Sequence, residues 1–384
     1  MKNGFRVLDS DMHVVEPPDL WQRYIAPAFR ERAPVGLLRF PRDFAMVVDG
    51  RSLGLAEGNP MRIKARDLTN AQKDERYAFA IAQGWDSHSQ LKAMDAEGID
   101  LAVMFPSRGL FVLGLDSTET AGEAGITPPY AAAIARAYND WMRDFCAVDR
   151  KRMFGAGMIA PHDIEGSASE VRRCVRDLGF KAMFTLPGCV NKRPWHHAAY
   201  DPLWAACQEA DVPIVFHGGG RDHLSPDFTL EVLEYVSMWH TFSHPLGPMM
   251  ALVSLTAGAV FERFPRLRAA FLEGNCSWAP WLFYRLDDLH EWRGRYEVPA
   301  LKAKPSEYFK RHCYISVEAD ESPVKWAVEA VGDENIVFST DYPHADAKFP
   351  YAVEKVQQLP VSKESMRKFL WDNCARLYKL EGRG

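Results

Sequence analysis

The chain has 384 residues, of which 47% are hydrophobic, and its 46 basic and 51 acidic residues give a formal net charge of −5. This length and apolar content suffice for one large domain with an extensive core. Because no basic block stands out, nucleic acid is not an expected partner. No apolar run is long enough to span a bilayer, and the N-terminus lacks the apolar segment of a signal peptide, so no membrane partner is expected either.

The cysteines indicate a reducing environment. There are seven, an odd number, and none of them forms a CxxC pair. This pattern is typical of free, mostly buried thiols in a cytoplasmic protein. The cysteines are Cys146, Cys174, Cys189, Cys207, Cys276, Cys313 and Cys374.

Eight short apolar runs predict buried strands. Most are nearly continuous in apolar residues, which is typical of parallel strands that are covered on both faces. In chain order they are Phe5–Asp11, Ile99–Phe105, Met153–Ile159, Lys181–Leu186, Pro213–His217, Leu267–Glu273, Cys313–Glu318 and Ile336–Asp341.

Helical patterns lie between these runs. They cover Ser87–Glu97, Pro129–Val148, Asp163–Leu178, Asp201–Ala210, Leu246–Phe264, Trp278–Trp292, Ser322–Val331 and Lys363–Leu380. Eight strands that alternate with helices predict a (β/α)8 barrel of the TIM type. An open doubly wound sheet is the alternative, and it is disfavoured because no glycine-rich dinucleotide motif follows the first strand.

The connection between the first two strands, residues 14–98, is too long for a single helix. It contains turn-forming residues at Pro17-Pro18 and Gly58-Asn-Pro60, and we expect it to form a lid or small insertion. No internal repeat or second domain is apparent, so residues 1–384 are expected to form one domain.

The first strand contains Asp9, Asp11 and His13. Side chains alternate along a strand, so these three are expected to point to one face. Two carboxylates and an imidazole at this spacing suit a divalent metal ion. Alternatively, Asp11 caps a helix and His13 is solvated.

Polar residues also end the later strands, at His217, Glu273, Glu318 and Asp341. The carboxyl ends of barrel strands converge on one face, where catalytic groups lie, and buried charges there require partners or a metal. Three alternatives stay open. His217 could be a core histidine, Asp341 could cap the turn before Pro343, and Glu273 could pair with an arginine.

Further histidines are weaker candidates. His240 and His244 are four residues apart and would share one face of a helix, although Ser243-His-Pro245 also resembles a helix start. We expect His344, three residues after Asp341, to support the site or contact the substrate. Arg221 and His223, in the loop after the fifth strand, are predicted to bind substrate.

Four motifs together carry a resemblance to a known family. They are Leu8-Asp-Ser-Asp-Met-His13, Pro202-Leu-Trp-Ala-Ala206 with Val215-Phe-His217, Phe261-Glu-Arg-Phe-Pro-Arg-Leu-Arg268 and Ser339-Thr-Asp-Tyr-Pro-His344. In this order the chain resembles the amidohydrolase superfamily, in the amidohydrolase-related branch that includes aminocarboxymuconate semialdehyde decarboxylase. The resemblance implies a distorted barrel with a divalent metal at its mouth, a homodimer, and either hydrolysis of a C–N or C–C bond or non-oxidative decarboxylation.

The resemblance also implies a ligand set. Asp11, His13, His217 and Asp341 take the positions of the family's metal ligands. Two residues depart from the pattern, because the family usually has His or Glu at the position of Asp11, and commonly an acid/base His at the position of Glu273. The second change alters the local charge, since a carboxylate is anionic near pH 7, and it counts against decarboxylation.

The family implies zinc, while the oxygen-rich ligand set would also accept manganese or iron. Glu273, His240 and His244 are additional candidate ligands, enough for a second metal ion. Our first expectation is a hydrolase in which metal-bound hydroxide attacks a carbonyl of a small organic substrate, with aromatic compounds included. Asp341 would shuttle the proton, and Glu273 and His244 would assist catalysis. The alternatives are a decarboxylase of an aromatic or muconate-type acid, a dinuclear iron or manganese enzyme that uses oxygen, and a non-catalytic binding protein.

Overall fold

Eight parallel strands form the centre of the computed structural model, which describes residues 1–53, 75–218, 233 and 235–382. The strands pair in the order in which they occur along the chain, as a barrel requires. They are β1 (Leu8–His13), β5 (Leu101–Phe105), β6 (Met153–Met158), β7 (Ala182–Thr185), β8 (Ile214–His217), β9 (Ala269–Leu272), β10 (Cys313–Val317) and β11 (Ile336–Phe338). All eight predicted strands are confirmed, and the fold is a (β/α)8 barrel.

The first and last strands approach each other through hydrogen bonds around β1. The Ser10 hydroxyl donates to the Phe338 carbonyl over 2.7 Å, and the amide of His13 donates to the Tyr342 carbonyl over 2.7 Å. The amide of Asp341 donates to the Asp11 carbonyl over 3.3 Å. These bonds place the segment after β11 directly beside the end of β1.

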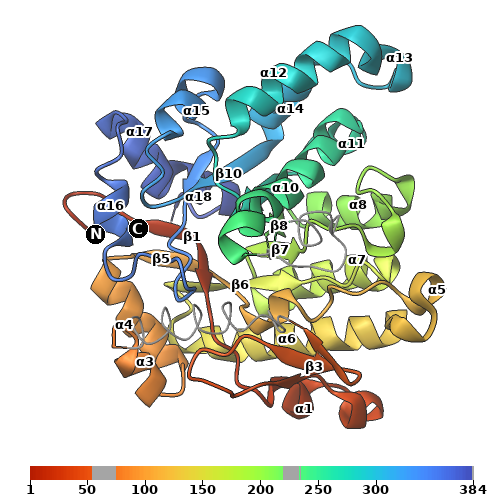
Figure 1. The fold of residues 1–384 in the computed structure, drawn as a ribbon, viewed down its shortest axis with the longest axis vertical. Coiled ribbons are helices and arrows are strands. Elements are labelled where there is room, and N and C mark those ends of the chain that lie inside the picture. The colour runs from red at the N-terminus through yellow and green to blue at the C-terminus, as the bar shows by residue number, and fades with distance from the viewer. Residues whose placement is uncertain (54–74, 219–232, 234, 383–384) are drawn as a thin grey trace.

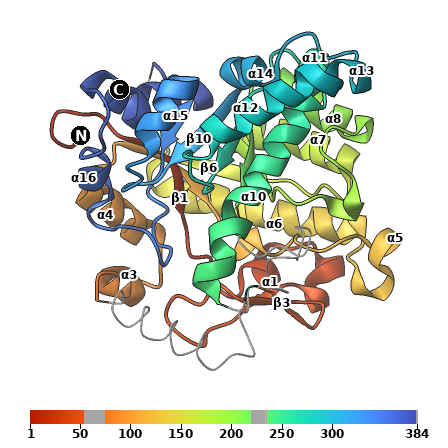
Figure 2. The same cartoon turned by 45° about the horizontal axis from the view of Figure 1, so that its top comes forward.

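Helices surround the strands on the outside of the barrel (Figures 1 and 2). The α-helices are α1 (Leu20–Tyr24), α3 (Ala78–Ala82), α4 (Ser87–Glu97), α5 (Thr118–Ala121), α6 (Pro128–Cys146), α7 (Ile164–Arg173), α8 (Asp201–Glu209), α10 (Val236–Ala257), α11 (Val260–Arg263), α12 (Ala279–Leu289), α13 (Arg295–Glu297), α14 (Pro305–His312), α15 (Val324–Val331), α16 (Ala352–Val356), α17 (Lys363–Arg367) and α18 (Asn373–Tyr378). None of the helices in the described segments has the length and apolarity needed to cross a membrane.

The start predicted for the long helix before β9 is wrong. Helix α10 begins at Val236, not near Leu246, and it contains Pro245 and Pro248 in its interior. Proline usually ends or kinks a helix because it lacks an N–H group. The sequence Ser243-His-Pro245 therefore resembles a helix start although the helix runs through it.

The connection between β1 and β5 contains a small antiparallel sheet. Its strands are β2 (Val35–Gly36), β3 (Met46–Val48) and β4 (Arg51–Leu53), and the sheet lies beside α1 and α6 at the lower edge of both views (Figures 1 and 2). Arg108, which follows β5, fixes this insertion by donating to the backbone carbonyls of Asp43 and Leu37. Its role as a lid stays a prediction.

Candidate functional site

The site begins with two side chains of β1. Asp11 and His13 are fully buried, and Nε2 of His13 lies 3.2 Å from Oδ1 of Asp11. Nδ1 of His13 lies 2.6 Å from the carbonyl of Pro106. A carbonyl can only accept a hydrogen bond, so Nδ1 carries the proton and the neutral ring directs the Nε2 lone pair at the site.

His217, at the end of β8, is held in the same way. Its Nδ1 lies 2.6 Å from the carbonyl of Gly218, so its Nε2 is the free nitrogen. That Nε2 lies 3.0 Å from Nε2 of His13 and 2.9 Å from Oδ2 of Asp11. The His13 lone pair, His217 and the Asp11 carboxylate therefore converge in a dry environment, where a proton on His217 or a bound divalent cation balances the negative charge.

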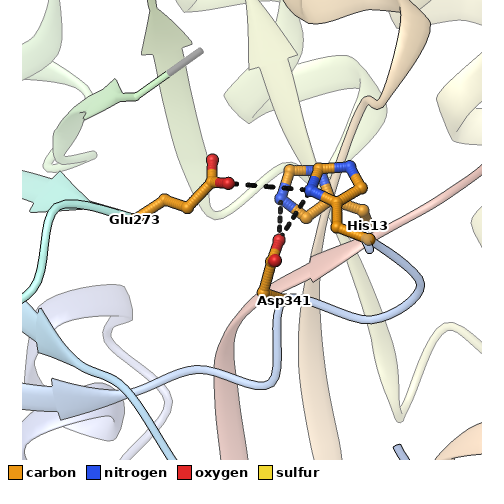
Figure 3. A group of neighbouring side chains, drawn as sticks. His13, Glu273 and Asp341 are labelled. Carbon is orange, nitrogen blue, oxygen red and sulfur yellow. Dashed lines mark ion pairs between the residues drawn. The ribbon is translucent and has the colours of Figure 1, made fainter. Parts of the chain in front are cut away.

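Asp341 and His344 extend this centre from the loop after β11. Oδ1 of Asp341 lies 3.4 Å from Nε2 of His13 and 2.7 Å from Nδ1 of His344. On its other side, Nε2 of His344 lies 3.0 Å from the Ser107 hydroxyl. Figure 3 shows Asp341 and Glu273 directed toward the imidazole rings at His13, from the segments that follow β11 and β9.

Glu273 directly follows β9 and is surrounded by imidazoles. Its Oε2 lies 3.2 Å from Nδ1 of His217, and its Oε1 lies 3.1 Å from Nε2 of His244 and 3.7 Å from Nδ1 of His344. Glu273 and Asp341 both have positive φ, of 51° and 54°. This backbone conformation is unfavourable for residues other than glycine, and it is frequent at functional sites.

The charges of these groups are strongly coupled. Burial opposes ionisation of Glu273, but His244 and His217 together lower the pKa of its carboxyl well below the ordinary value. Burial and the charge of Glu273 raise the pKa of Asp341, against the effect of His344. Burial and His344 lower the pKa of His13 to about 4. Burial opposes the charge on His217, whose pKa Asp11 and Glu273 nevertheless raise to about 9.

The donor set fits a divalent metal ion. Two groups of residues offer ligand atoms within 4.8 Å of one another: an inner group of Asp11, His13 and His217, and an outer group of His13, Glu273, Asp341 and His344. Both oxygens of Asp11 and Oδ1 of Asp341 are buried without a hydrogen-bond partner. Imidazole nitrogens and carboxylate oxygens are the ligands expected for zinc, manganese or iron.

The structure separates the weaker candidates. His244 reaches Glu273, whereas His240 stacks on His244 with ring centres 4.2 Å apart and belongs to neither ligand group. The alternative in which Glu273 pairs with an arginine is wrong for the described residues, since its ion-pair partners there are histidines. Arg221 and His223 lie outside the described residues.

Asp9 connects the two segments that carry Asp11 and Asp341. Its carboxylate accepts hydrogen bonds from the amides of Thr340 and Asp11, each over 3.1 Å, and from the Thr340 hydroxyl. The register of β1 on β5 also shifts between Asp9 and Met12, which interrupts simple alternation of side chains. Asp9 therefore joins the ends of β1 and β11 and belongs to neither ligand group.

Three neighbours of the site were not identified from the sequence. Ser107 contacts His344, and Phe44 of the insertion lies with its ring centre 5.1 Å from that of His344. Asp346 lies close enough for its charge to act on Glu318 and His244. Ser107 follows a predicted strand, a signal that could have identified it, whereas nothing in the sequence links Phe44 to His344.

The chain is similar to known proteins in sequence. The family model described as Amidohydrolase matches residues 113–380. The 2-amino-3-carboxymuconate-6-semialdehyde decarboxylase of Dictyostelium discoideum is 24% identical over 264 residues, 67% of each chain. The gamma-resorcylate decarboxylase of Polaromonas sp. strain JS666 is 24% identical over 298 residues, 76% of this chain and 86% of that protein.

Solved structures share the fold over nearly the full length. An amidohydrolase from Mycobacterium avium subsp. paratuberculosis superimposes with a TM-score of 0.74 at 20% identity, covering 98% of this chain and 99% of the other. A second solved structure is a 5-carboxyvanillate decarboxylase from Novosphingobium aromaticivorans, complexed with manganese and 4-hydroxy-3-methoxy-5-nitrobenzoic acid. It superimposes with a TM-score of 0.67 at 21% identity and covers 99% of this chain and 97% of the other. At these identities the likeness concerns the fold.

Proposed function

Because this chain belongs to the amidohydrolase family, we propose that it is a metal-dependent, non-oxidative decarboxylase of an aromatic acid. The observation that supports the proposal is the contact of Asp341 with both His13 and His344, because a carboxyl and an imidazole in contact can act as an acid–base pair beside the candidate metal ligands. The two sequence relatives named above, from Dictyostelium discoideum and Polaromonas, are decarboxylases, which favours this chemistry over the hydrolysis first expected from the sequence.

Asp11, His13, His217 and Asp341 would hold the metal ion. Manganese is our first choice, because a similar fold binds it and because the set contains two carboxylates. When bound, the metal supplies a positive charge that orients the substrate's oxygen atoms and stabilises negative charge on them.

The protein's own residues then handle one proton. The carboxyl of Asp341, in contact with His344, donates a proton to the ring carbon that bears the carboxylate. A C–H bond forms there, the C–C bond to the carboxylate breaks, and its electron pair returns to the ring as carbon dioxide leaves. Ser107 keeps His344 oriented through the contact at Nε2.

Phe44 favours an aromatic substrate. Its ring lies 5.1 Å from the ring of His344 and therefore forms an apolar surface beside the acid–base pair. Aromatic rings stack favourably at such distances. Arg221 and His223 stay candidate contacts for the substrate's acidic groups.

The test is product analysis. Protein loaded with Mn²⁺ is incubated with hydroxybenzoates that carry a carboxylate beside a hydroxyl. The release of carbon dioxide and the uptake of oxygen are both measured. In parallel it is offered amides and lactones. We expect carbon dioxide release without oxygen consumption. Hydrolysis of an amide or lactone without carbon dioxide release would contradict the proposal, as would oxygen uptake.

Asp341→Asn should lower the rate of carbon dioxide release by about 10²- to 10⁴-fold, the usual contribution of a general acid. Asparagine tolerates positive φ, so the backbone conformation at position 341 can be kept. The matched control is Asp346→Asn, which removes an exposed carboxylate of the same loop. Equal losses in both variants would contradict the role of Asp341.

Assembly and location complete the proposal. None of the seven cysteines forms a disulfide, which is in keeping with a cytoplasmic protein. The resemblance to the family and a set of exposed aromatic side chains on α12 and α13 support a homodimer.

A further inference from the structure

Glu318 carries a carboxyl group at the barrel mouth that the proposed metal binding and proton transfer do not use. It directly follows β10, which pairs with β9 on one side and with β11 on the other. Glu318 therefore lies between the strand ends that lead to Glu273 and to Asp341. It belongs to neither ligand group.

The side chain of Glu318 is directed into the mouth. Side chains alternate along a strand, so Glu318 continues the face of β10 that carries Ser316. The Ser316 hydroxyl accepts a hydrogen bond from the amide of Glu273 over 3.0 Å, so this face is turned toward the segment after β9. The strongest charged neighbours are Asp341, Asp346 and Glu273, which all surround the candidate site.

The next carboxylate along the chain, that of Glu321, has a structural role that Glu318 lacks. Oε1 of Glu321 accepts hydrogen bonds from the amides of Cys276 and Ser277 over 2.9 and 2.8 Å. Its Oε2 accepts one from the amide of Glu318 over 3.1 Å. Glu321 thus joins the loops after β9 and β10. By contrast, no hydrogen bond or ion pair among the described residues reaches the carboxyl group of Glu318, which is half-buried.

The surroundings of Glu318 are acidic. Burial and the charge of Asp341 raise the pKa of its carboxyl well above the ordinary value. Lys348, in the loop after β11, pairs with Asp320 at 3.3 Å. A further negative charge beside Glu318 is therefore unfavourable. A neutral hydroxyl group suits this position, because a carboxyl accepts its hydrogen bond and, when protonated, can also donate one.

We propose that Glu318 determines substrate specificity by hydrogen bonding to a hydroxyl group on the aromatic ring of the substrate, and that it disfavours a second carboxylate there. This inference rests on the proposed function, in which the reacting carboxylate of an aromatic acid lies beside Asp341. A site whose polar group is left unpaired by the wrong substrate discriminates against that substrate. The preferred substrate is then a hydroxylated aromatic monocarboxylic acid.

The experiment compares substrates that differ in one ring substituent. Hydroxybenzoates receive a further hydroxyl, hydrogen or carboxylate at each free ring position in turn, and kcat/KM for carbon dioxide release is measured with Mn²⁺-loaded protein. The parent protein should prefer the hydroxyl at one position. In Glu318→Ala this preference should fall by about 10- to 100-fold, as expected for one lost hydrogen bond in a water-poor site.

Glu318→Gln separates hydrogen bonding from charge, and also serves if the alanine variant does not fold. Glutamine both donates and accepts hydrogen bonds but cannot ionise. This variant should keep the hydroxyl preference and accept the dicarboxylate better than the parent protein does. An unchanged hydroxyl preference in Glu318→Ala would overturn the proposal, as would a parent protein that prefers the dicarboxylate.

Asp320→Asn is the matched control, because it removes an exposed carboxylate of the same loop whose partner is Lys348. The hydroxyl preference should stay unchanged in this variant, and an equal loss would contradict a specific role of Glu318. All variants should bind as much Mn²⁺ as the parent protein, since neither residue belongs to a ligand group. Loss of the metal in Glu318→Gln would contradict a role in specificity alone.

Equilibrium binding distinguishes failure of this inference from failure of the proposed function. Phenols with and without the further hydroxyl, which have no carboxylate to lose, are titrated into Mn²⁺-loaded protein by calorimetry. Hydroxyl preference in Kd that falls in Glu318→Ala, without carbon dioxide release from any benzoate, would contradict the decarboxylase and support the role of Glu318. Carbon dioxide release without such a preference in kcat/KM or Kd would overturn only the role of Glu318.

Discussion

At the scale of single residues, backbone carbonyls determine which ring nitrogen of His13 and of His217 faces the candidate metal site. His13 and His217 each direct Nδ1 at a carbonyl, of Pro106 and of Gly218, and this contact leaves each Nε2 free to bind a cation. Their side chains are fully buried, so water cannot replace a missing partner. Each imidazole should therefore contribute directly to metal affinity.

His217→Ala should remove most of the bound metal. The variant deletes one of the two converging Nε2 atoms and leaves Asp11 without its 2.9 Å contact. The measurement is metal per chain by elemental analysis after purification without added metal. His162→Ala is the matched control, because His162 is also largely buried and contacts a backbone carbonyl, that of Leu115. Full metal content in His217→Ala would refute its role as a ligand.

At the scale of elements, Glu16 connects the insertion to the barrel. Its carboxylate accepts hydrogen bonds from three successive amides after β5, those of Ser107, Arg108 and Gly109, over 3.2, 3.0 and 2.8 Å. Glu16 is 1% exposed. This contact fixes the turn from which Ser107 reaches His344, so it couples the insertion to the site.

Glu16→Ala should lower the free energy of unfolding by about 3–5 kcal/mol, since it leaves three amides without their acceptor and each loss costs about 1–3 kcal/mol before relaxation. Denaturant titration followed by tryptophan fluorescence measures this change. Glu16→Gln keeps an acceptor oxygen, so its free energy of unfolding should fall by less. Glu31→Ala, at an exposed position, should have a free energy of unfolding within about 0.5 kcal/mol of that of the parent protein. A loss below 1 kcal/mol in Glu16→Ala would contradict the role of these hydrogen bonds.

The barrel was predictable because each of its buried strands is an apolar run in the sequence. The insertion was not, since β2, β3 and β4 have only two or three residues each, too few to show a periodic pattern. The candidate side chains Asp11, His217, Glu273 and Asp341 were found because they end strands. The partners of the site histidines that are distant in sequence, such as the carbonyl of Pro106 beside His13, depend on the tertiary structure and leave no pattern in the sequence.

At the scale of the whole molecule, α12, α13 and the π-helical segment between them (His290–Gly294) carry an aromatic face, defined as Trp281, Tyr284, Trp292 and Tyr296. Their exposed fractions are 61%, 68%, 66% and 71%. Both helices lie at the outer edge of the molecule (Figure 1). Large aromatic side chains each offer about 150–250 Å², so the exposed parts of these four side chains reach the size of the largest apolar patch on a typical monomer, which is often a functional surface.

We expect the aromatic face to form the interface of the homodimer. Light scattering should give twice the mass of the chain, and the double variant Trp281→Glu, Trp292→Glu should give the mass of one chain, because a charge at the centre of an apolar interface loses its hydration without gaining a partner. The matched control is Trp326→Glu on α15, where the side chain is 55% exposed but lies outside the aromatic face. A parent protein that is monomeric at high concentration would contradict the dimer. A dimer that survives the double variant would place the interface elsewhere.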